Sequence, residues 1–158
     1  MNRKISYLSL GSNLGDRENY LLRAIKKIIT YPNNLLLKVS SIYETEPWGM
    51  KNTKYAPRFL NQCIKMETTL TPFELLEFLE SIEKDLGRVK KNNCESRTID
   101  LDILLYGDEI VCAPKLQIPH RHMHKRKFVL LPLLEIEPSL QDPVSGKRYA
   151  SILEVLKD

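Results

Sequence analysis

The sequence contains little cysteine, which limits both the stabilisation and the chemistry open to it. Three cysteines occur in 158 residues, Cys63, Cys94 and Cys112, and none of them forms a CxxC pair. An odd number without that spacing indicates neither a disulfide framework nor a cysteine zinc site. We therefore expect reduced thiols and a fold that is stabilised by its hydrophobic core, which a chain of this length can build without cross-links.

Long hydrophobic runs are also missing. The longest, residues 128–134, contains a proline and is far shorter than the ~20 residues of a membrane-spanning helix. The N-terminal segment passes directly into an alternating pattern, without the apolar core and small-residue cleavage site of a signal peptide. We expect one cytoplasmic domain over residues 1–158, without a membrane partner.

Charge of one sign is in small excess only. The chain has 24 Lys and Arg against 20 Asp and Glu, a net charge of +4. This excess is too small to predict a nucleic-acid partner by itself. The positions of the charges carry more information, because basic residues gather in residues 88–97 and 120–127.

Alternation of apolar and polar residues predicts most of the strands. It indicates strands over residues 5–10, 35–45, 59–68 and 98–106. Gly107 and Asp108 then predict a hairpin turn from the last of these strands into a short strand over residues 109–111.

Helix signals occur at two places between the strands. Asp16 is the expected N-cap of a first helix, and Thr71, Pro72 and Glu74 form the start pattern of a second, which ends at Gly87. Two short helical patterns follow near the C-terminus. This order of elements favours an α+β sandwich with a mainly antiparallel sheet.

Two aspartates stand in the otherwise apolar strand over residues 98–106. A period of two places Asp100 and Asp102 on one face, with Cα atoms ~6.6 Å apart. The same period places four apolar residues on the opposite face: Ile99, Leu101, Ile103 and Leu105. Aspartate is a poor strand residue, so the pair requires an explanation. A solvated face with salt bridges is one, and a Mg²⁺ site completed by substrate phosphates is the other.

The loop before this strand places cations next to the aspartates. Its basic residues are Arg88, Lys90, Lys91 and Arg97. Carboxylates that hold a metal, together with arginines, suit a polyphosphate, because phosphoryl transfer depends on neutralising charge on the nonbridging oxygens. A solvated basic loop is the alternative for this segment taken alone.

The second basic cluster contains three alternating histidines. His120, His122 and His124 could ligate a transition metal, but the surrounding positive charge disfavours a cation. We expect anion contacts from His120 and Arg126, and an exposed face for the other two histidines.

Small and aromatic residues suggest where a planar ligand could bind. Residues 11–15 lie between a strand and a helix and allow a ligand close to the backbone, although they match neither GxxxxGK[ST] nor GxGxxG. Trp48, Phe59 and Phe128 could stack on a planar ligand or belong to the core. Asn61 is an unusual polar residue at the start of a strand.

Together these segments resemble the 6-hydroxymethyl-7,8-dihydropterin pyrophosphokinase family over nearly the whole chain. The matching motifs, in the order of the family, are GSN at 11–13, YETEPWG at 43–49, FLN at 59–61, GR at 87–88, RTIDLDIL at 97–104, and PH at 119–120 followed by RKFVLLPL at 126–133. RTIDLDIL is the most specific of them.

The resemblance implies a fold, a reaction and a set of site residues. The fold is a ferredoxin-like α+β sandwich with a mainly antiparallel sheet, flanking helices and extra C-terminal elements. The reaction is transfer of pyrophosphate from ATP to the pterin hydroxymethyl group, with AMP leaving. Asp100 and Asp102 would hold two Mg²⁺ ions, and Arg88 and Arg97 would close over the triphosphate as catalytic residues.

The remaining implied roles concern the two small-molecule substrates. The pterin contacts would be Thr45, Trp48, Phe59, Asn61 and Phe128. The nucleotide contacts would be Glu83, Lys90, Ile103, His120 and Arg126.

Two other functions are compatible with parts of the sequence. One is an RNA-binding ferredoxin-like module, although the chain lacks the RNP1 aromatic and glycine run and carries two acids in a central strand. The other is a regulatory pterin-binding or nucleotide-binding module without catalysis. We expect neither a nucleic-acid partner nor an obligate protein partner.

Overall fold

The computed structural model describes residues 2–46, 58–87 and 98–156. Its centre is an antiparallel sheet of β1 (Lys4–Ser12), β2 (Asn34–Val39), β3 (Tyr43–Thr45), β4 (Phe59–Thr68) and β5 (Asp100–Tyr106). The strand order is β2-β4-β1-β5, and β3 also pairs with β4. The predicted antiparallel sheet is therefore confirmed.

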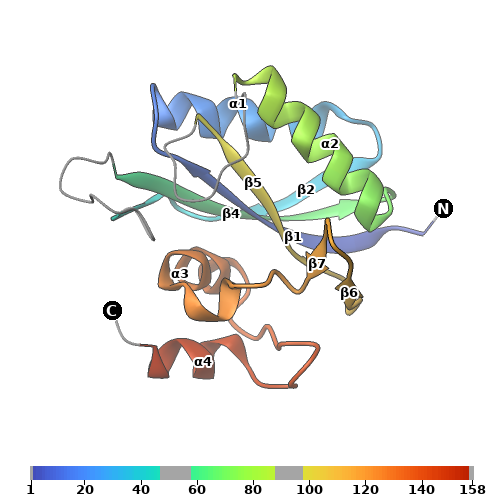
Figure 1. Ribbon diagram of the computed structural model, residues 1–158, viewed down its shortest axis with the longest axis vertical. Helices are drawn as coiled ribbons and strands as arrows, with labels where there is room; N and C mark the ends of the chain where they lie inside the picture. Colours follow the sequence, from blue (N-terminus) through green and yellow to red (C-terminus); the bar gives the residue numbers. More distant parts are fainter. Residues whose placement is uncertain (1, 47–57, 88–97, 157–158) are drawn as a thin grey trace.

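Helices cover both faces of the sheet (Figure 1). One face carries α1 (Arg17–Thr30) and α2 (Pro72–Asp85), and the other carries α3 (Lys127–Ile136), with α4 (Tyr149–Val155) packed outside it. A short 3₁₀ helix, η1 (Met123–Lys125), precedes α3. No helix within the described ranges is long and apolar enough to cross a bilayer.

Local capping chemistry sets the starts of α1 and α2. The Asp16 side chain accepts a hydrogen bond from the Asn19 amide, and Thr71 and Glu74 form a reciprocal capping box. These bonds satisfy amides that have no partner inside a helix. Gly87 follows the end of α2 with φ +97°, a left-handed conformation that favours glycine. The predicted helix boundaries are confirmed.

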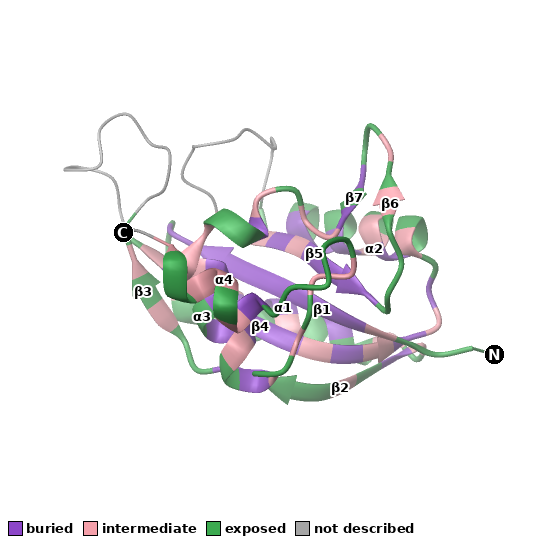
Figure 2. Ribbon diagram, turned by 90° about the horizontal axis from the view of Figure 1, so that it is seen from below, coloured by how far each residue is buried: buried purple, intermediate pink, exposed green. Residues whose placement is uncertain are grey.

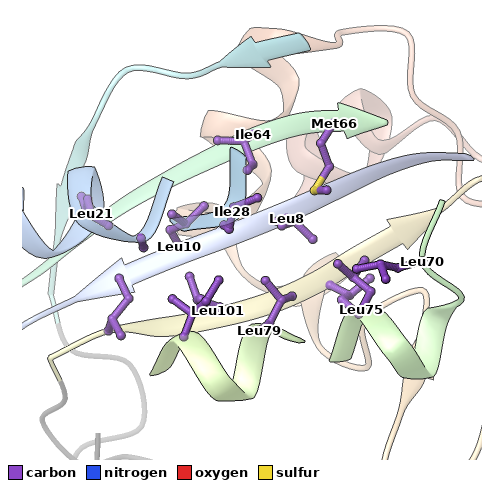
Figure 3. Packing of buried hydrophobic residues seen from close by; sticks show 14 of the residues in the cluster. Leu8, Leu10, Leu21, Ile28, Ile64, Met66, Leu70, Leu75, Leu79 and Leu101 are labelled. Carbon is purple, nitrogen blue, oxygen red and sulfur yellow. The ribbon is translucent and has the colours of Figure 1, made fainter. Parts of the chain in front are cut away.

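Two hydrophobic clusters lie on the two faces of the sheet. The first packs β1, β4 and β5 against α1 and α2 through leucines such as Leu8, Leu21 and Leu79 (Figure 3). The second packs Cys63, Leu104 and other residues of the same sheet against α3 and α4. The central strands are mostly buried and the edge strand β2 is largely exposed (Figure 2). The core therefore holds the sheet rigidly between two helical layers.

The strand predicted over residues 35–45 is two strands, β2 and β3. Val39 pairs with Ile64 of β4, and Tyr43 pairs with Asn61. Five residues, 39–43, therefore lie opposite four residues of β4, 61–64, and the chain between β2 and β3 contains one extra residue. Ser40 bonds to β4 at the break: its amide donates to the Cys63 carbonyl at 2.9 Å and its hydroxyl accepts from the Cys63 amide at 2.9 Å. The extra residue interrupts regular pairing and bends the chain.

The hairpin predicted from the Asp100–Tyr106 strand into residues 109–111 is also wrong in its pairing. β6 (Val111–Cys112) pairs instead with β7 (Gln117–Ile118). The turn at Gly107 does form, and residues 113–116 form a second turn between β6 and β7, with the Ala113 amide 3.0 Å from the Leu116 carbonyl.

The predicted alternation in β5 holds only up to Ile103. Leu8 and Tyr7 are consecutive in β1, but their partners in β5 are Ile103 and Leu105. Leu104 is therefore an extra residue of β5 that forms a β-bulge. Leu105 therefore lies with Leu104 in the second cluster, not with Ile103 in the first. Asp100 and Asp102 precede the bulge and keep their common face.

Candidate active site

The two aspartates of β5 face a floor of small residues on β1. Asp100 pairs with Gly11 and Asp102 with Ser9. Residues directly opposite each other in an antiparallel pair point to the same side of the sheet. Both aspartates are partly exposed. The carboxylates thus stand beside Gly11 and Ser9, where little side-chain volume blocks the approach of a ligand.

The same row of residues continues across the sheet to β4 and β3. Gly11 pairs with Asn61, which pairs with Tyr43, while Thr45 pairs with Phe59. Asn61 is 4% exposed and its Nδ2 donates to the Thr45 Oγ1 at 2.6 Å. With strands about 4.8 Å apart, Asp100 and Asn61 lie about 10 Å apart on one face. The candidate metal and pterin residues therefore share one surface.

Gly11 separates these two groups without filling the space between them. A Cβ at this position would lie 3.4 Å from Asn61 Oδ1 and 3.6 Å from Phe59 Cδ1. Glycine therefore keeps the floor open beside both side chains.

His120 closes the aspartate side of the surface. Its Nε2 lies 3.9 Å from Asp102 Oδ1, and its Nδ1 accepts from the His122 amide at 3.2 Å. A neutral imidazole that accepts at Nδ1 carries its proton at Nε2, which here faces the carboxylate. The backbone amide of His120 also donates to the Leu104 carbonyl at 3.0 Å, so the bulge of β5 anchors this histidine.

The basic cluster of residues 120–127 is partly folded into the structure. His124 is exposed as predicted, but His122 is partly buried. Burial lowers the pKa of His122, and the nearby charges of Arg126 and Arg121 lower it further. His122 is therefore biased towards its neutral form.

The α3 helix brings two further candidates to this face. Arg126 precedes the helix, and its guanidinium carbon lies 5.6 Å from the centre of the Phe128 ring. Phe128 is partly buried against the second cluster. Since α3 packs on β4, β1 and β3, both side chains belong to the layer that borders the surface.

Glu83 and Ile103 are more buried than typical ligand contacts. Glu83, on α2, is 4% exposed, and its Oε2 accepts from the Leu101 amide at 2.8 Å. Leu101 lies between the two aspartates, so this bond holds the outer edge of β5 at that point. Ile103 is 4% exposed in the first cluster. Nucleotide contacts for both residues stay predictions.

Loss of the Glu83 carboxylate should therefore destabilise the protein. In Glu83→Ala the Leu101 amide loses its buried acceptor, which costs about 1–3 kcal/mol of unfolding free energy. Urea denaturation would measure the change. Glu80→Ala, at an exposed position of the same helix, is the matched control. Equal stability of the two variants would show that the bond contributes nothing.

Four candidates lie outside the described residues: Trp48, Arg88, Lys90 and Arg97. Gly87 and Thr98, which flank residues 88–97, are close together, since a Cβ at Gly87 would lie 3.9 Å from Thr98 Cγ2. These two flanking residues therefore lie beside each other just before β5 begins. Cys63 and Cys112 are free thiols, and Cys94 also lies outside the described residues.

The carboxylate pair fits a magnesium ion that is shared with a phosphate ligand. Within the described ranges, no group of three or more His, Cys, Asp or Glu side chains could hold a metal by itself. Mg²⁺ in nucleotide sites commonly takes one or two carboxylates, with phosphate and water oxygens completing its octahedron. Two aspartates on one open face meet that requirement.

Sequence reasoning missed several residues of this region. Ser9 is the floor beside Asp102, and the period of two in β1 places it on the same face as Gly11. Arg17 and Glu135 also bond to β3, the strand that carries Thr45, through the side chains of Glu44 and Tyr43. No local pattern indicates these last contacts, because their partners are distant in the sequence.

Comparison with known proteins gives a consistent result. The family model described as 7,8-dihydro-6-hydroxymethylpterin-pyrophosphokinase (HPPK) matches residues 7–138. The chain is 43% identical over 141 residues to the 2-amino-4-hydroxy-6-hydroxymethyldihydropteridine pyrophosphokinase of Aquifex aeolicus, covering 89% of this chain and 85% of that protein. It is 46% identical over 132 residues to the Bacillus subtilis protein of the same name, covering 84% and 77%.

Longer proteins contain a similar region. The folic acid synthesis protein fol1 of Pneumocystis carinii is 44% identical over 152 residues, which are 96% of this chain and 20% of that protein. A crystal structure of HPPK-DHPS in complex with substrates superimposes with a TM-score of 0.74 at 16% identity, covering 97% of this chain and 43% of that one. A Plasmodium falciparum HPPK-DHPS structure with STZ-DHP gives 0.76 at 15%, covering 97% and 45%. At these identities the superpositions concern the fold.

Proposed function

This chain belongs to the 7,8-dihydro-6-hydroxymethylpterin-pyrophosphokinase family, and on that premise we propose which of its residues bind the metal, the nucleotide and the pterin. The enzyme transfers the pyrophosphoryl group of ATP to the hydroxymethyl group of the dihydropterin in folate biosynthesis. The pterin hydroxymethyl oxygen bonds to the β-phosphorus, the bond from that phosphorus to the α,β-bridging oxygen breaks, and AMP leaves. The observation that carries the assignment of residues is the row Asp100, Gly11, Asn61 across β5, β1 and β4.

The core of the fold is a ferredoxin-like unit with C-terminal additions. The strand order β2-β4-β1-β5, with α1 and α2 together on one face, supports this assignment. The helices α3 and α4 are the additions, and they cover the other face. This arrangement leaves the row of site residues at the end of the sheet that α3 borders.

Asp100 and Asp102 would hold two Mg²⁺ ions together with the triphosphate. Bound there, the ions would supply positive charge that neutralises the transferred group. The chain supplies the geometry: the β5 ladder with β1 fixes both carboxylates on one face, and Glu83 holds the strand between them from its outer edge.

The nucleotide lies beside this carboxylate pair. His120 presents its Nε2 proton next to Asp102, and Arg126 adds a fixed positive charge at the start of α3. Arg88, Lys90 and Arg97 belong to the segment between Gly87 and Thr98, two residues that lie beside each other, and we expect these three cations to contact the triphosphate. Cations on several sides of a triphosphate neutralise part of its negative charge, which reduces its electrostatic repulsion of the attacking oxygen.

The pterin lies at the other end of the row, against β3 and β4. Thr45 Oγ1 accepts from Asn61, so its own hydroxyl proton is available to a ligand atom, while Asn61 Oδ1 can accept. The pair therefore presents a donor and an acceptor to a flat heterocycle. Phe59, Phe128 and Trp48 supply aromatic surface for stacking.

Measurement of AMP tests this function directly. With ATP and 6-hydroxymethyl-7,8-dihydropterin, we expect AMP to form only when the pterin and Mg²⁺ are both present. ADP as product would instead mean transfer of a single phosphoryl group. Pterin binding without any turnover would favour the regulatory module that the sequence left open.

A further inference from the structure

The strand that carries Thr45 needs support from outside the sheet. β3 is only three residues long, and within the described ranges its one strand partner is β4. So short a strand makes few ladder hydrogen bonds, and the bend after β2 disconnects it from the regular pairing before it. Contacts with other elements must therefore fix its position.

Glu135, near the end of α3, binds the start of this strand. Its two carboxylate oxygens accept from the Ser41 amide at 3.1 and 2.9 Å, and Oε2 accepts from the Ser41 hydroxyl at 3.0 Å. Oε1 also accepts from the Tyr43 hydroxyl at 2.7 Å. Hydrogen bonds to a carboxylate are about twice as strong as neutral ones. Together they tie the β2–β3 bend to α3.

The titration of the two side chains agrees with this contact. The bond from Tyr43 and then those from Ser41 lower the pKa of Glu135. The bond to Glu135 is the largest cause that raises the pKa of Tyr43. The charged carboxylate is thus the form that the contact stabilises.

The position of Glu135 in α3 links β3 to the pterin ring contact. Glu135 lies seven residues after Phe128, which is close to two helical turns, so both point to one side of the helix. One rigid element therefore carries an aromatic residue of the pterin site and the anchor of the strand that carries Thr45. The distance between these two parts of the site depends on that anchor.

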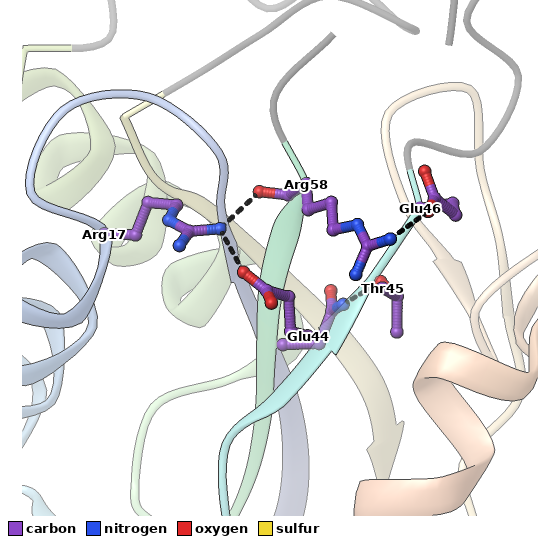
Figure 4. A network of polar contacts seen from close by, with 6 residues as sticks. Arg17, Glu44, Thr45, Glu46 and Arg58 are labelled. Atoms are coloured by element: carbon purple, nitrogen blue, oxygen red, sulfur yellow. Dashed lines mark hydrogen bonds and ion pairs between the residues drawn. The ribbon is translucent and has the colours of Figure 1, made fainter. Parts of the chain in front are cut away.

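Arg17, the first residue of α1, binds the same strand from the opposite side of the molecule. Its Nη1 donates to Glu44 Oε2 at 2.9 Å and to the Arg58 carbonyl at 2.8 Å (Figure 4). Arg58 in turn pairs with Glu46, its Nη2 2.8 Å from Oε1. Arg17 therefore bridges β3 and the residue just before β4. Both contacts are exposed, but Arg17 donates two hydrogen bonds here whereas the Glu135 carboxylate accepts four, so we expect the Arg17 contact to be the weaker of the two.

We propose that Glu135 and Arg17 are positioning residues for pterin recognition, which hold β3 so that Thr45 and Asn61 keep their bonded arrangement. The proposal rests on the proposed assignment of Thr45 and Asn61 to the pterin. It assigns to Glu135 the larger effect, since three donors on two residues converge on its carboxylate. The ATP side of the site lies at the other end of the row and depends on neither contact.

Separate Michaelis constants for the two substrates test the proposal. We expect Glu135→Ala to raise the pterin KM about tenfold and Arg17→Ala about threefold, with the ATP KM within about twofold of the unmodified protein. Glu135→Gln keeps one acceptor oxygen and should restore part of the loss. Tyr43→Phe removes a single bond and should raise the pterin KM less than Glu135→Ala. Glu154→Ala, exposed on α4, is the matched control and should change neither constant.

The outcomes separate this inference from the function on which it rests. If Thr45→Val leaves the pterin KM unchanged, the proposed pterin contact is wrong. If Thr45→Val raises it but Glu135→Ala and Tyr43→Phe do not, the positioning inference is wrong. Equal increases of both Michaelis constants in Glu135→Ala would show a general structural role and would also overturn it. A Glu135→Ala/Thr45→Val double variant should lose less than the product of the single losses.

Discussion

Alanine at Asp100 or at Asp102 is expected to abolish turnover while the fold stays intact. Each carboxylate lies on the one face of β5 that borders Gly11 and Ser9, and each is proposed to hold the metal that neutralises the triphosphate. Loss of one such electrostatic contribution to a transition state costs about 1,000-fold in kcat, and loss of a metal ligand should cost at least that. The measurement is AMP formation at saturating substrates and Mg²⁺.

Stability distinguishes a catalytic loss from an unfolded protein. Both aspartates are partly exposed and aspartate is a poor strand residue, so alanine should change the unfolding midpoint little. Asp108→Ala, in the exposed turn after β5, is the matched control and should keep full activity. Asp102→Asn removes the charge and keeps the shape, and should be nearly as inactive as the alanine variant. Normal activity in both alanine variants would contradict the metal assignment.

Alanine at Arg97 should produce the second large loss. Arg97 precedes Asp100 by three residues, and three extended residues span about 10 Å, so its guanidinium can reach the phosphates held by the aspartates. Removing a positive charge that meets developing negative charge costs about 3 kcal/mol, equivalent to roughly 150-fold in kcat. Single-turnover measurement of AMP formation reports this chemical step apart from product release.

Arg97→Lys tests the geometry of that contact. Lysine keeps the charge but cannot form the paired, planar hydrogen bonds of a guanidinium, so an intermediate rate is expected. Arg3→Ala, at the other end of the sheet, removes the same charge far from the site and should leave the rate unchanged. A normal single-turnover rate in Arg97→Ala would remove this residue from the catalytic set.

Local chemistry made several features of this protein predictable from the chain alone. The caps at Asp16, Thr71 and Gly87 depend on residues within one turn of each helix end, and all three form as expected. The common face of Asp100 and Asp102 follows from strand periodicity, which holds because no bulge separates them. The motifs around these residues identify the family for the same reason, since each is a short continuous segment.

Tertiary pairing decided the features that local patterns could not. Alternation assigns side chains to the two faces of a strand, but it does not say where an extra residue will shift the pairing. The bulge at Leu104 therefore becomes evident only when β5 is paired with β1, and the break after Val39 only when β2 is paired with β4. The Glu83 bond to Leu101 and the Glu135 bonds to Ser41 join residues 18 and 94 positions apart. The chain alone determined which groups could do the chemistry, whereas their support was decided by contacts between distant segments, because only folding brings such donors and acceptors together.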